Sequence, residues 1–351
     1  MPPRETIHVD GSYGEGGGQI LRTSVALSAL TGRAIEVTDI RKNRPNPGLA
    51  PQHLHGVKAI QQLTVAHIEG LGIGSTRIEF VPRGIRSGEY EVEIGTAGSI
   101  SLILQVFMPP AAFGNDVVFA AISGGTDVKW SPPMDYLRNV FLKILTKMGY
   151  MGEVEIVRRG YYPRGDGAVK AKILPTRHLK LIELTKRGEF KKILGVSHSM
   201  NLPSHVVERQ RKAALEVLKG YDPEITLEYN RGNSMGCGLT LWAEFENTVL
   251  GASSLGKLGK PAEKVGREAA QRLLDEINSG APLDRYMGDQ IIPYMALAKG
   301  TSKIVVGELT GHLKTNIYVT EEILGNEFEI VEEGSGYTIK TEGIGFENRF
   351  I

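Results

Sequence analysis

Asp10-Gly-Ser-Tyr-Gly-Glu-Gly-Gly-Gly-Gln-Ile-Leu-Arg22 is a glycine-rich turn that runs directly into an apolar segment. Glycine at this density costs backbone entropy, so it is expected where the chain turns sharply or where a ligand approaches the main chain. Residues 20–27 have the pattern of a buried helix, whose first N–H groups would face the turn and suit phosphate oxygens. Neither the dinucleotide fingerprint nor the Gly-Lys-Ser/Thr ending of a P-loop is present. The stretch therefore predicts a helix that starts at either a phosphate site or a tight structural corner.

Working outward from this turn, short strands and helices alternate through the first 180 residues. Predicted strands cover 34–40, 76–81, 90–94, 116–123, 153–158 and 168–174, and predicted helices cover 51–66, 99–108 and 132–148. Twice, the order along the chain is strand, helix, strand, helix and then two strands in succession. This order predicts a repeated β-α-β-α-β-β unit in an α/β (α+β) fold.

The order of predicted elements changes between residues 186 and 251. Here a strand at 195–198, a helix at 204–219 and strands at 224–229 and 238–246 form a compact set. We interpret 186–251 as an inserted small α/β domain whose boundary extends at most to about 280. Residues 1–185 and 252–351 then make up the large domain. Helices at 261–277 and 289–298 and strands at 302–306 and 315–319 predict a third copy of the unit, and 343–351 an extended or loosely ordered end.

Composition narrows the classes of protein. The 351 residues are 41% hydrophobic, enough for one large core or two smaller ones. No run is long enough to cross a bilayer, and Met1-Pro-Pro-Arg-Glu5 lacks the apolar core of a signal peptide. The single cysteine, Cys237, allows no disulfide within the chain, and we interpret it as a small apolar residue. These features predict a cytoplasmic protein without a membrane partner.

The charge balance points to a limited contact with nucleic acid. The chain has 41 basic and 40 acidic residues, whereas proteins that coat long nucleic acid normally carry a strong basic excess. Recognition of one phosphorylated end needs only a few arginines. Arg41, Lys42 and Arg44 form the densest basic cluster near the glycine turn, and a solvated surface is the alternative interpretation.

Four separated motifs stand out in the sequence. They are Gly14-Glu-Gly-Gly-Gly-Gln19 with Arg22; Arg44-Pro-Asn-Pro-Gly-Leu49 with Gln52-His53; Ser123-Gly-Gly-Thr-Asp127 with Ser131-Pro-Pro133; and Gly311-His-Leu-Lys-Thr-Asn316. Together and in this order they resemble the RNA 3′-terminal phosphate cyclase family. The resemblance covers nearly the whole chain. It implies a large domain of three repeats, each similar to the C-terminal domain of a bacterial initiation factor and related to enolpyruvyl transferases, with a small domain inserted before the last repeat.

His312 is the expected catalytic centre. By itself a lone histidine is more often packed or solvated, although neutral imidazole can act as a nucleophile near neutral pH. The resemblance implies that His312, which we expect at the start of a strand, attacks the α-phosphorus of ATP and carries AMP. AMP then passes to the 3′-terminal phosphate of RNA, and the adjacent 2′-hydroxyl closes a 2′,3′-cyclic phosphate.

Charged residues near the glycine turn suit this phosphoryl chemistry. The guanidinium forks of Arg22 and Arg44 match phosphate oxygens. Glu15 suits a ligand of Mg²⁺ (or Mn²⁺) held with the triphosphate, or else is an exposed carboxylate on a turn. Gln52 and Arg41 are the candidates for contact with the RNA end.

The nucleoside is expected to lie between two further segments. The resemblance implies that Pro132 and Tyr286 pack on opposite faces of the adenine. Asp289 and Gln290 suit the ribose, the base edge or the phosphates, although they could be simple helix caps. Two further candidates for contact with the nucleotide are Gln105 and Leu255. Gln105 could instead be a core amide whose hydrogen bonds are all made within the protein, and some relatives carry an aromatic residue near the position of Leu255.

Two alternatives stay open. One is a catalytically silent relative that acts in ribosomal RNA processing, which His312 and Glu15 argue against. The other is an enolpyruvyl transferase, supported only by fold analogy. The oligomeric state is not predicted.

Overall fold

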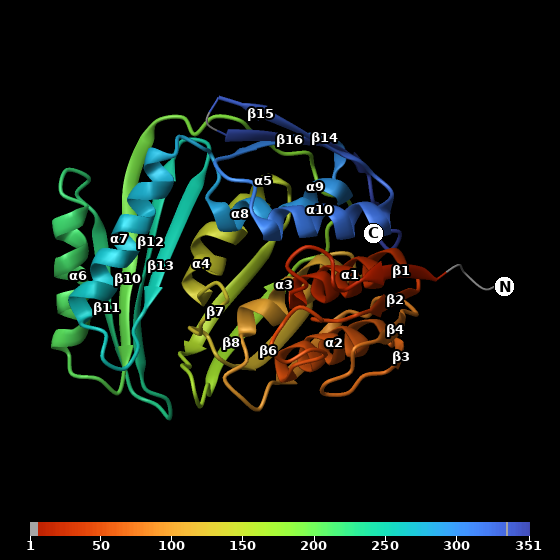
Figure 1. The fold of residues 1–351 in the computed structure, drawn as a ribbon, viewed down its shortest axis with the longest axis horizontal. Helices are drawn as coiled ribbons and strands as arrows, with labels where there is room; N and C mark the ends of the chain where they lie inside the picture. Colours follow the sequence, from red (N-terminus) through yellow and green to blue (C-terminus); the bar gives the residue numbers. More distant parts are fainter. Residues whose placement is uncertain (1–5, 335) are drawn as a thin grey trace.

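The computed structural model describes residues 6–334 and 336–351. Met1–Glu5, on which the absence of a signal-peptide core was argued, lie outside the described residues. Sixteen strands, ordered in four sheets, and the helices between them make up the described chain (Figure 1). Among these residues no helix combines the length and apolar character that a membrane span needs.

Three copies of one unit build the large domain. The first copy comprises β1 (Ile7–Asp10), α1 (Gly18–Thr31), β2 (Ile35–Thr38), α2 (Pro51–Thr64), β3 (His67–Glu69) and β4 (Ile78–Val81). The second comprises β5 (Gly88–Glu93), α3 (Ile100–Ala111), β6 (Val118–Gly124), the continuous helical segment α4 (Met134–Tyr136), η1 (Leu137–Phe141) and α5 (Leu142–Lys147), then β7 (Gly152–Arg158) and β8 (Gly167–Ile173). The third comprises β9 (Glu183–Leu184), α8 (Arg285–Gln290), α9 (Ile292–Leu297), β14 (Lys299–Val306), α10 (Gly311–Leu324), β15 (Phe328–Glu333) and β16 (Gly336–Ile344).

Strand pairing is the same in all three copies. The sheet orders are β1-β2-β4-β3, β5-β6-β8-β7 and β9-β14-β16-β15. In each sheet the first two strands of the unit pair in parallel, and the remaining pairs are antiparallel. The predicted β-α-β-α-β-β repeat is therefore confirmed, with the third copy interrupted directly after β9.

The interruption holds a fourth sheet. Its elements are β10 (Phe190–Met200), α6 (His205–Val217), β11 (Glu224–Asn230), β12 (Gly236–Phe245), β13 (Val249–Leu255) and α7 (Ala262–Asn278). The sheet order is β11-β10-β12-β13, and α6 and α7 pack together against it over a core separate from that of the repeats. Because α7 packs on α6, β12 and β13, we draw the inserted unit to Asn278, the wider of the two boundaries that the sequence allowed.

Two expectations for the third copy were wrong. Residues 315–319 are not a strand but part of α10, so His312 lies in the first turn of a helix. The Thr310 hydroxyl caps that helix by accepting from the Leu313 N–H at 3.0 Å, and the buried Leu313, Ile317 and Thr320 lie at the i, i+4, i+7 spacing of a helix. The helix at 261–277 is α7, which belongs to the inserted unit rather than to the repeat.

The end of the chain is also more firmly attached than expected. Residues 343–344 complete β16. Beyond them, the buried Asn348 side chain donates to the Gly114 carbonyl at 2.7 Å, and its backbone N–H donates to the Arg177 carbonyl at 2.7 Å.

Helices from different repeats meet at the centre of the large domain. Helix α1 packs against α2, α3 and α10, and one continuous hydrophobic core joins the three repeats (Figure 1). The prediction that the glycine turn leads into a buried helix is confirmed by α1, whose residues are almost all buried. Because α1 lies beside α10, the glycine turn and the first turn of α10 come together.

Candidate functional site

The glycine turn packs closely against two other segments. Gly14 and Gly16 have φ values of +57° and +55°, which non-glycine residues rarely adopt. A Cβ at Gly18 would lie 1.9 Å from His53 Nε2, and a Cβ at Gly311 would lie 2.5 Å from Glu15 Oε1. Glycine is thus required here for close approach, and this approach brings Glu15 to the start of α10.

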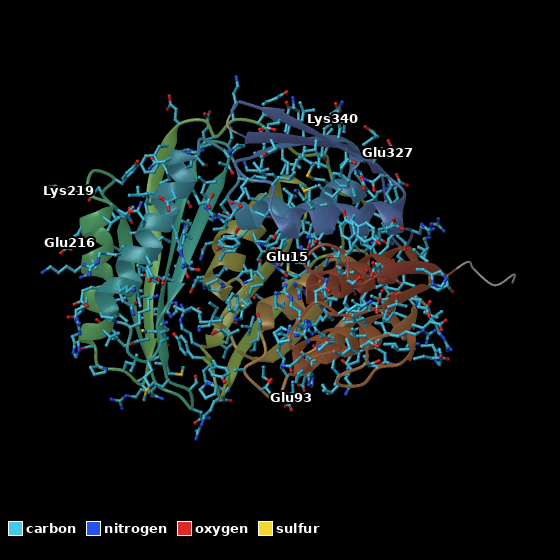
Figure 2. All side chains as sticks on the ribbon, viewed as in Figure 1. Glu15, Glu93, Glu216, Lys219, Glu327 and Lys340 are labelled. Carbon is cyan, nitrogen blue, oxygen red and sulfur yellow. The ribbon has the colours of Figure 1, made fainter. Side chains whose placement is uncertain are left out.

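A loose cluster of charges lies where these segments meet. His312 Nε2 is 3.7 Å from Glu15 Oε2, and Arg44 Nη2 donates to the same oxygen at 3.4 Å. The His312 and Glu15 side chains are 48% and 46% exposed, and Figure 2 shows Glu15 near the middle of the molecule. Gln19 Nε2 donates to the His312 carbonyl at 3.2 Å and so ties α1 to α10. The cluster remains open to a ligand from solvent.

The surroundings keep the His312 imidazole neutral near physiological pH. Burial lowers its pKa from the ordinary value, the nearby Glu15 carboxylate opposes this, and Arg22 and Arg44 lower the pKa further. A neutral ring nitrogen carries the lone pair that a nucleophile needs. The side chain therefore fits the role that the sequence suggested.

Arg22 and Asp289 form a second layer behind this cluster. Burial lowers the Arg22 pKa to about 10, against the opposing effect of Asp289, so the guanidinium is still charged at neutral pH. Burial and the neighbouring Asp284 raise the pKa of Asp289 well above its usual range. Asn316 donates from Nδ2 to the Asp289 carbonyl at 2.7 Å. Its Oδ1 accepts from the Thr23 hydroxyl at 2.7 Å, which links α1, α8 and α10.

The 41–53 segment supplies the other side of the cluster. Arg41 donates from Nη1 to the Gly48 carbonyl at 2.8 Å, while Gln52 is partly buried next to Gly98. His53 was quoted in a motif but not predicted as a site residue. It is buried, accepts from the Ala50 N–H at 3.2 Å, and has its pKa lowered to about 3 by burial, then by Arg22 and Arg41. Its position in the motif was the only sequence signal for this role.

Most of the predicted nucleoside residues meet around α8. Gln105 of α3 donates from Nε2 to Gln290 Oε1 at 2.8 Å. Tyr286 is partly exposed, and its ring meets Tyr136 edge-on at 6.3 Å between centroids. The helix cap is Asp284, which accepts from the N–H groups of residues 286 and 287, so Asp289 and Gln290 do not cap this helix N-terminus.

The remaining two candidates lie on flanking segments. Pro132 precedes α4, and its carbonyl accepts from the Ser101 hydroxyl at 2.6 Å. Leu255 ends β13 in the inserted unit, where a Cβ at Gly238 would lie 2.9 Å from its side chain and Lys260 donates to its carbonyl at 3.0 Å. Since α4 packs against β13, where a Cβ at Gly251 would lie 2.7 Å from the Tyr136 ring, this strand lies at the inserted unit's border with the second repeat.

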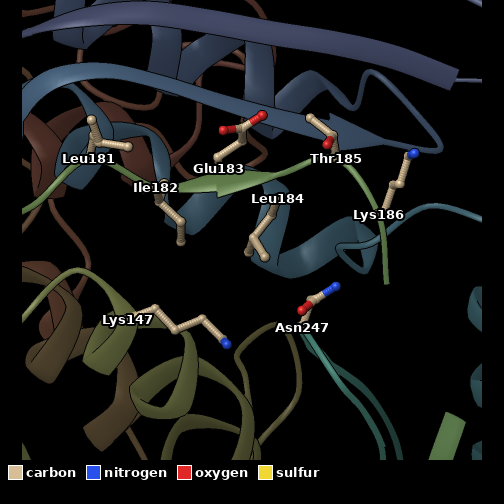
Figure 3. A pocket seen from close by; sticks show the side chains of 8 residues that line it. All are labelled: Lys147, Leu181, Ile182, Glu183, Leu184, Thr185, Lys186 and Asn247. Carbon is tan, nitrogen blue, oxygen red and sulfur yellow. The ribbon is translucent and has the colours of Figure 1, made fainter. Parts of the chain in front are cut away.

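A separate pocket lies between the second repeat, β9 and the inserted unit. It has a volume of about 380 Å³ (Figure 3). Its lining residues are Lys147, Leu181, Ile182, Glu183, Leu184, Thr185, Lys186 and Asn247. None of them is a predicted site residue.

Residues 13–330 match the family model described as RNA 3′-terminal phosphate cyclase. The chain belongs to this family. A protein of that name from Pyrococcus furiosus is 50% identical over 326 residues, which are 92% of this chain and 95% of the relative. Those from Pyrobaculum aerophilum and Methanopyrus kandleri are each 48% identical and cover 97% of this chain and 99% of their own length.

A solved structure with a similar fold was also found. The enolpyruvyl transferase NikO from Streptomyces tendae aligns with a TM-score of 0.36 and 13% identity, over 96% of this chain and 49% of that chain. At this TM-score the likeness supports no statement about function.

Proposed function

We propose that this member of the family converts an RNA 3′-terminal phosphate into a 2′,3′-cyclic phosphate at the expense of ATP, as a ligase-type nucleotidyl-transfer enzyme. The observation that carries the proposal is the His312 imidazole, neutral near physiological pH and lying 3.7 Å from Glu15, with Arg44 bound to the same carboxylate. The names of the relatives support the cyclase reaction. The open, charged surroundings of His312 support the covalent step.

The reaction has three displacements at phosphorus. A His312 ring nitrogen attacks the α-phosphorus of ATP, a P–N bond forms, and pyrophosphate leaves. An oxygen of the RNA 3′-phosphate then attacks the same phosphorus, the P–N bond breaks, and AMP is joined to the RNA end. Finally the 2′-hydroxyl loses its proton and attacks the phosphorus of the RNA 3′-phosphate, which closes the cyclic phosphate and releases AMP.

The charged groups around His312 suit the negative charge that each displacement concentrates on oxygen. Arg22 and Arg44 would hold phosphoryl oxygens through their guanidinium forks. Arg41 and Gln52 would contact the RNA end. The nucleoside would be held by Gln105, Pro132, Leu255, Tyr286, Asp289 and Gln290.

The Glu15 carboxylate fits Mg²⁺ (or Mn²⁺) only when the ion is shared with substrate. Three metal-ligating groups come together in the described chain at Asp127, Asp135 and His198, a set that does not include Glu15. A single half-exposed carboxylate is nevertheless typical of Mg²⁺ sites that are completed by nucleotide phosphates and water. The ion would neutralise charge on the triphosphate.

The experiment is incubation of the protein with α-labelled ATP and Mg²⁺, followed by mapping of the label. We expect label on His312, sensitive to acid and stable to alkali, as expected of a P–N bond. A silent relative or an enolpyruvyl transferase would stay unlabelled. Label on any other residue would overturn the assignment of the nucleophile.

The proposed RNA specificity is tested with three versions of one oligonucleotide that differ only at the 3′ end. A 3′-phosphate next to a 2′-hydroxyl should be cyclised. A 3′-phosphate on a 2′-deoxy terminal sugar should accept AMP and stop there, because the attacking group is missing. A 3′-hydroxyl end should be inert, and its conversion would contradict the proposal.

A further inference from the structure

Two aromatic side chains stand out from the surface at adjacent loops of the second repeat. Trp130 follows β6 and is 94% exposed, and Tyr162 lies between β7 and β8 and is 77% exposed. Asp127 and Tyr161 form a backbone bridge, so the two loops run side by side. Trp130 has a φ of +67°, a conformation that a bulky residue rarely adopts. The loop thus holds a large ring in solvent at a cost in backbone energy.

Exposed cations lie on the same two loops and on the β11–β12 loop. Lys129, Arg164 and Arg231 are exposed, and none forms an ion pair within 6–334 and 336–351. Arg164 Nη1 donates to the Asn233 carbonyl at 3.4 Å, which reaches the β11–β12 loop of the inserted unit. We call the five residues Lys129, Trp130, Tyr162, Arg164 and Arg231 the aromatic rim.

The carboxylates near the aromatic rim are already engaged. Asp166 accepts from Arg158 at 2.9 Å and from Asn233 at 2.6 Å. Glu228, on the neighbouring β11, pairs with the buried Arg159 at 2.7 Å. The three cations of the rim therefore remain available for an anionic partner.

The rim has a rigid base. Beneath it, Arg159 binds Asp135 at 2.7 Å, and the Tyr161 hydroxyl donates to His198 Nδ1 at 2.6 Å, all within the buried contact of the second repeat with the inserted unit. These contacts fix the 125–133 and 159–166 loops, so ordering them adds little entropic cost on binding. Figure 1 shows the β7–β8 and β11–β12 loops at the same end of the molecule.

Close backbone contacts connect the rim to the candidate site. A Cβ at Gly165 would lie 2.8 Å from the Ala97 Cα, and one at Gly98 would lie 3.4 Å from the Gln52 Cβ. Gln52 precedes His53, which abuts Gly18 at the start of α1. A series of contacting segments thus leads from the loop of the aromatic rim, through residues 96–98 and Gln52, to the glycine turn.

We propose that the aromatic rim binds the nucleotides immediately upstream of the RNA 3′-terminal phosphate, a site that rests on the proposed function. Trp130 and Tyr162 would stack on unpaired bases, and the three cations would meet the backbone phosphates. Stacking accepts every base, so the rim selects single-stranded ends without selecting a sequence. The combination of free cations with exposed rings favours RNA over an apolar protein segment.

The test compares Trp130→Ala/Tyr162→Ala with Phe350→Ala, a control at another ring that is 60% exposed. Two 3′-phosphorylated substrates are used, a single-stranded decamer and a dinucleotide too short to reach the rim. We expect the KM for the decamer to rise roughly 5- to 150-fold per lost ring, the range of base–aromatic stacking. The dinucleotide reaction and self-adenylylation should stay near the original rates in both variants.

Tryptophan fluorescence supplies a readout that does not depend on catalysis. The chain has two tryptophans, and Trp242 is buried, so titration with an unreactive 3′-hydroxyl decamer should quench Trp130. Lys129→Gln and Arg164→Gln should each reduce the salt dependence of this binding, by about 0.7 in the slope of log affinity against log salt. Unchanged decamer affinity and no quenching would overturn the rim. Quenching without any self-adenylylation would leave the rim in place and overturn the proposed function.

Discussion

Two groups of charged side chains contain the same residue types but differ in exposure. The group around His312 is open to solvent, and the group around Arg159 is buried. Around His312 the closest polar contacts to Glu15 are 3.4 and 3.7 Å, and the side chains are half exposed. Around Arg159, contacts of 2.7 Å to Asp135 and 3.3 Å to Asp127 are almost fully buried. Loosely paired, solvated charges can exchange their partners for a ligand, whereas the tightly paired buried ones hold two units together.

The members of the buried group pair mainly with one another, although the buried Asp127 Oδ1 and His198 Nε2, 3.4 Å apart, make no hydrogen bond. Burial lowers the pKa of Arg159, but Asp127 and Asp135 outweigh this and raise it well above its usual range. Burial and Arg159 keep the pKa of His198 well below its ordinary value, so its ring is neutral. Because Nε2 faces the Asp127 carboxylate at 3.4 Å, we place the ring proton there, and Nδ1 then accepts from the Tyr161 hydroxyl at 2.6 Å. Although Asp127, Asp135 and His198 could ligate a metal, the Arg159 guanidinium already supplies the positive charge that the carboxylates need.

Replacing each of the two histidines by alanine gives the largest expected contrast between the open and the buried group. His312→Ala should abolish self-adenylylation and all ATP-dependent cyclisation while changing stability little, because the side chain is half exposed. His198→Ala should retain labelling but lose about 1–3 kcal/mol of unfolding free energy, since the buried Tyr161 hydroxyl loses its acceptor. Labelling with α-labelled ATP and urea unfolding measure the two effects. Labelling of the His312→Ala protein would remove the distinction between the two groups.

Breaking the buried group at its cation should cost about 3–5 kcal/mol of unfolding free energy. Arg159→Ala leaves Asp127 and Asp135 without their positive partner in a dry environment. Arg209→Ala is the matched control, since Arg209 binds Glu263 through two exposed contacts of 2.6 and 2.9 Å and should cost less than about 1 kcal/mol. Equal losses for the two variants, measured by urea unfolding, would contradict the role given to burial.

Arg44 of the open group and the more buried Arg22 behind it should show their effect in catalysis instead. Arg22→Ala and Arg44→Ala should each remove roughly 2–5 kcal/mol of transition-state stabilisation, because phosphoryl oxygens lose a charged partner. Lysine at either position should restore only part of the rate, since it lacks the guanidinium fork. Single-turnover adenylylation measures the loss, and circular dichroism checks the fold. Near-native turnover in both alanine variants would show that the arginines do not contact the phosphates.

The difference between the two groups also marks what the sequence could predict. Local patterns predicted the repeat and the glycine turn into α1, because periodicity and glycine density are local properties. The third copy was harder, since its two-residue β9 lies a whole inserted unit away from α8. The β-branched and aromatic residues at Ile317–Thr320 favoured a strand, and the Thr310 cap together with packing on α1 made it a helix.

The buried group left little local signal. Asp127 was quoted at the end of one motif without a role, Asp135, Arg159 and His198 were not singled out, and only the contact between the second repeat and the inserted unit brings the four together. The candidate site was easier to predict because motifs already named most of its members. His53 was missed as a site residue because its role depends on the close approach to Gly18.

The smallest expected effect is a shift of one titration. Because the pKa of His312 lies below the ordinary histidine value, its neutral form persists at pH 6.5, and adenylylation should fall only as more acidic conditions protonate the ring. Glu15 raises this pKa and Arg44 lowers it, so Glu15→Gln should move the acidic limb to lower pH and Arg44→Ala should move it to higher pH. Proton NMR of the ring, assigned by the signal missing in His312→Gln, measures the pKa without requiring turnover. An unchanged pKa in both variants would mean that burial alone, and not the open charge cluster, sets the protonation of His312.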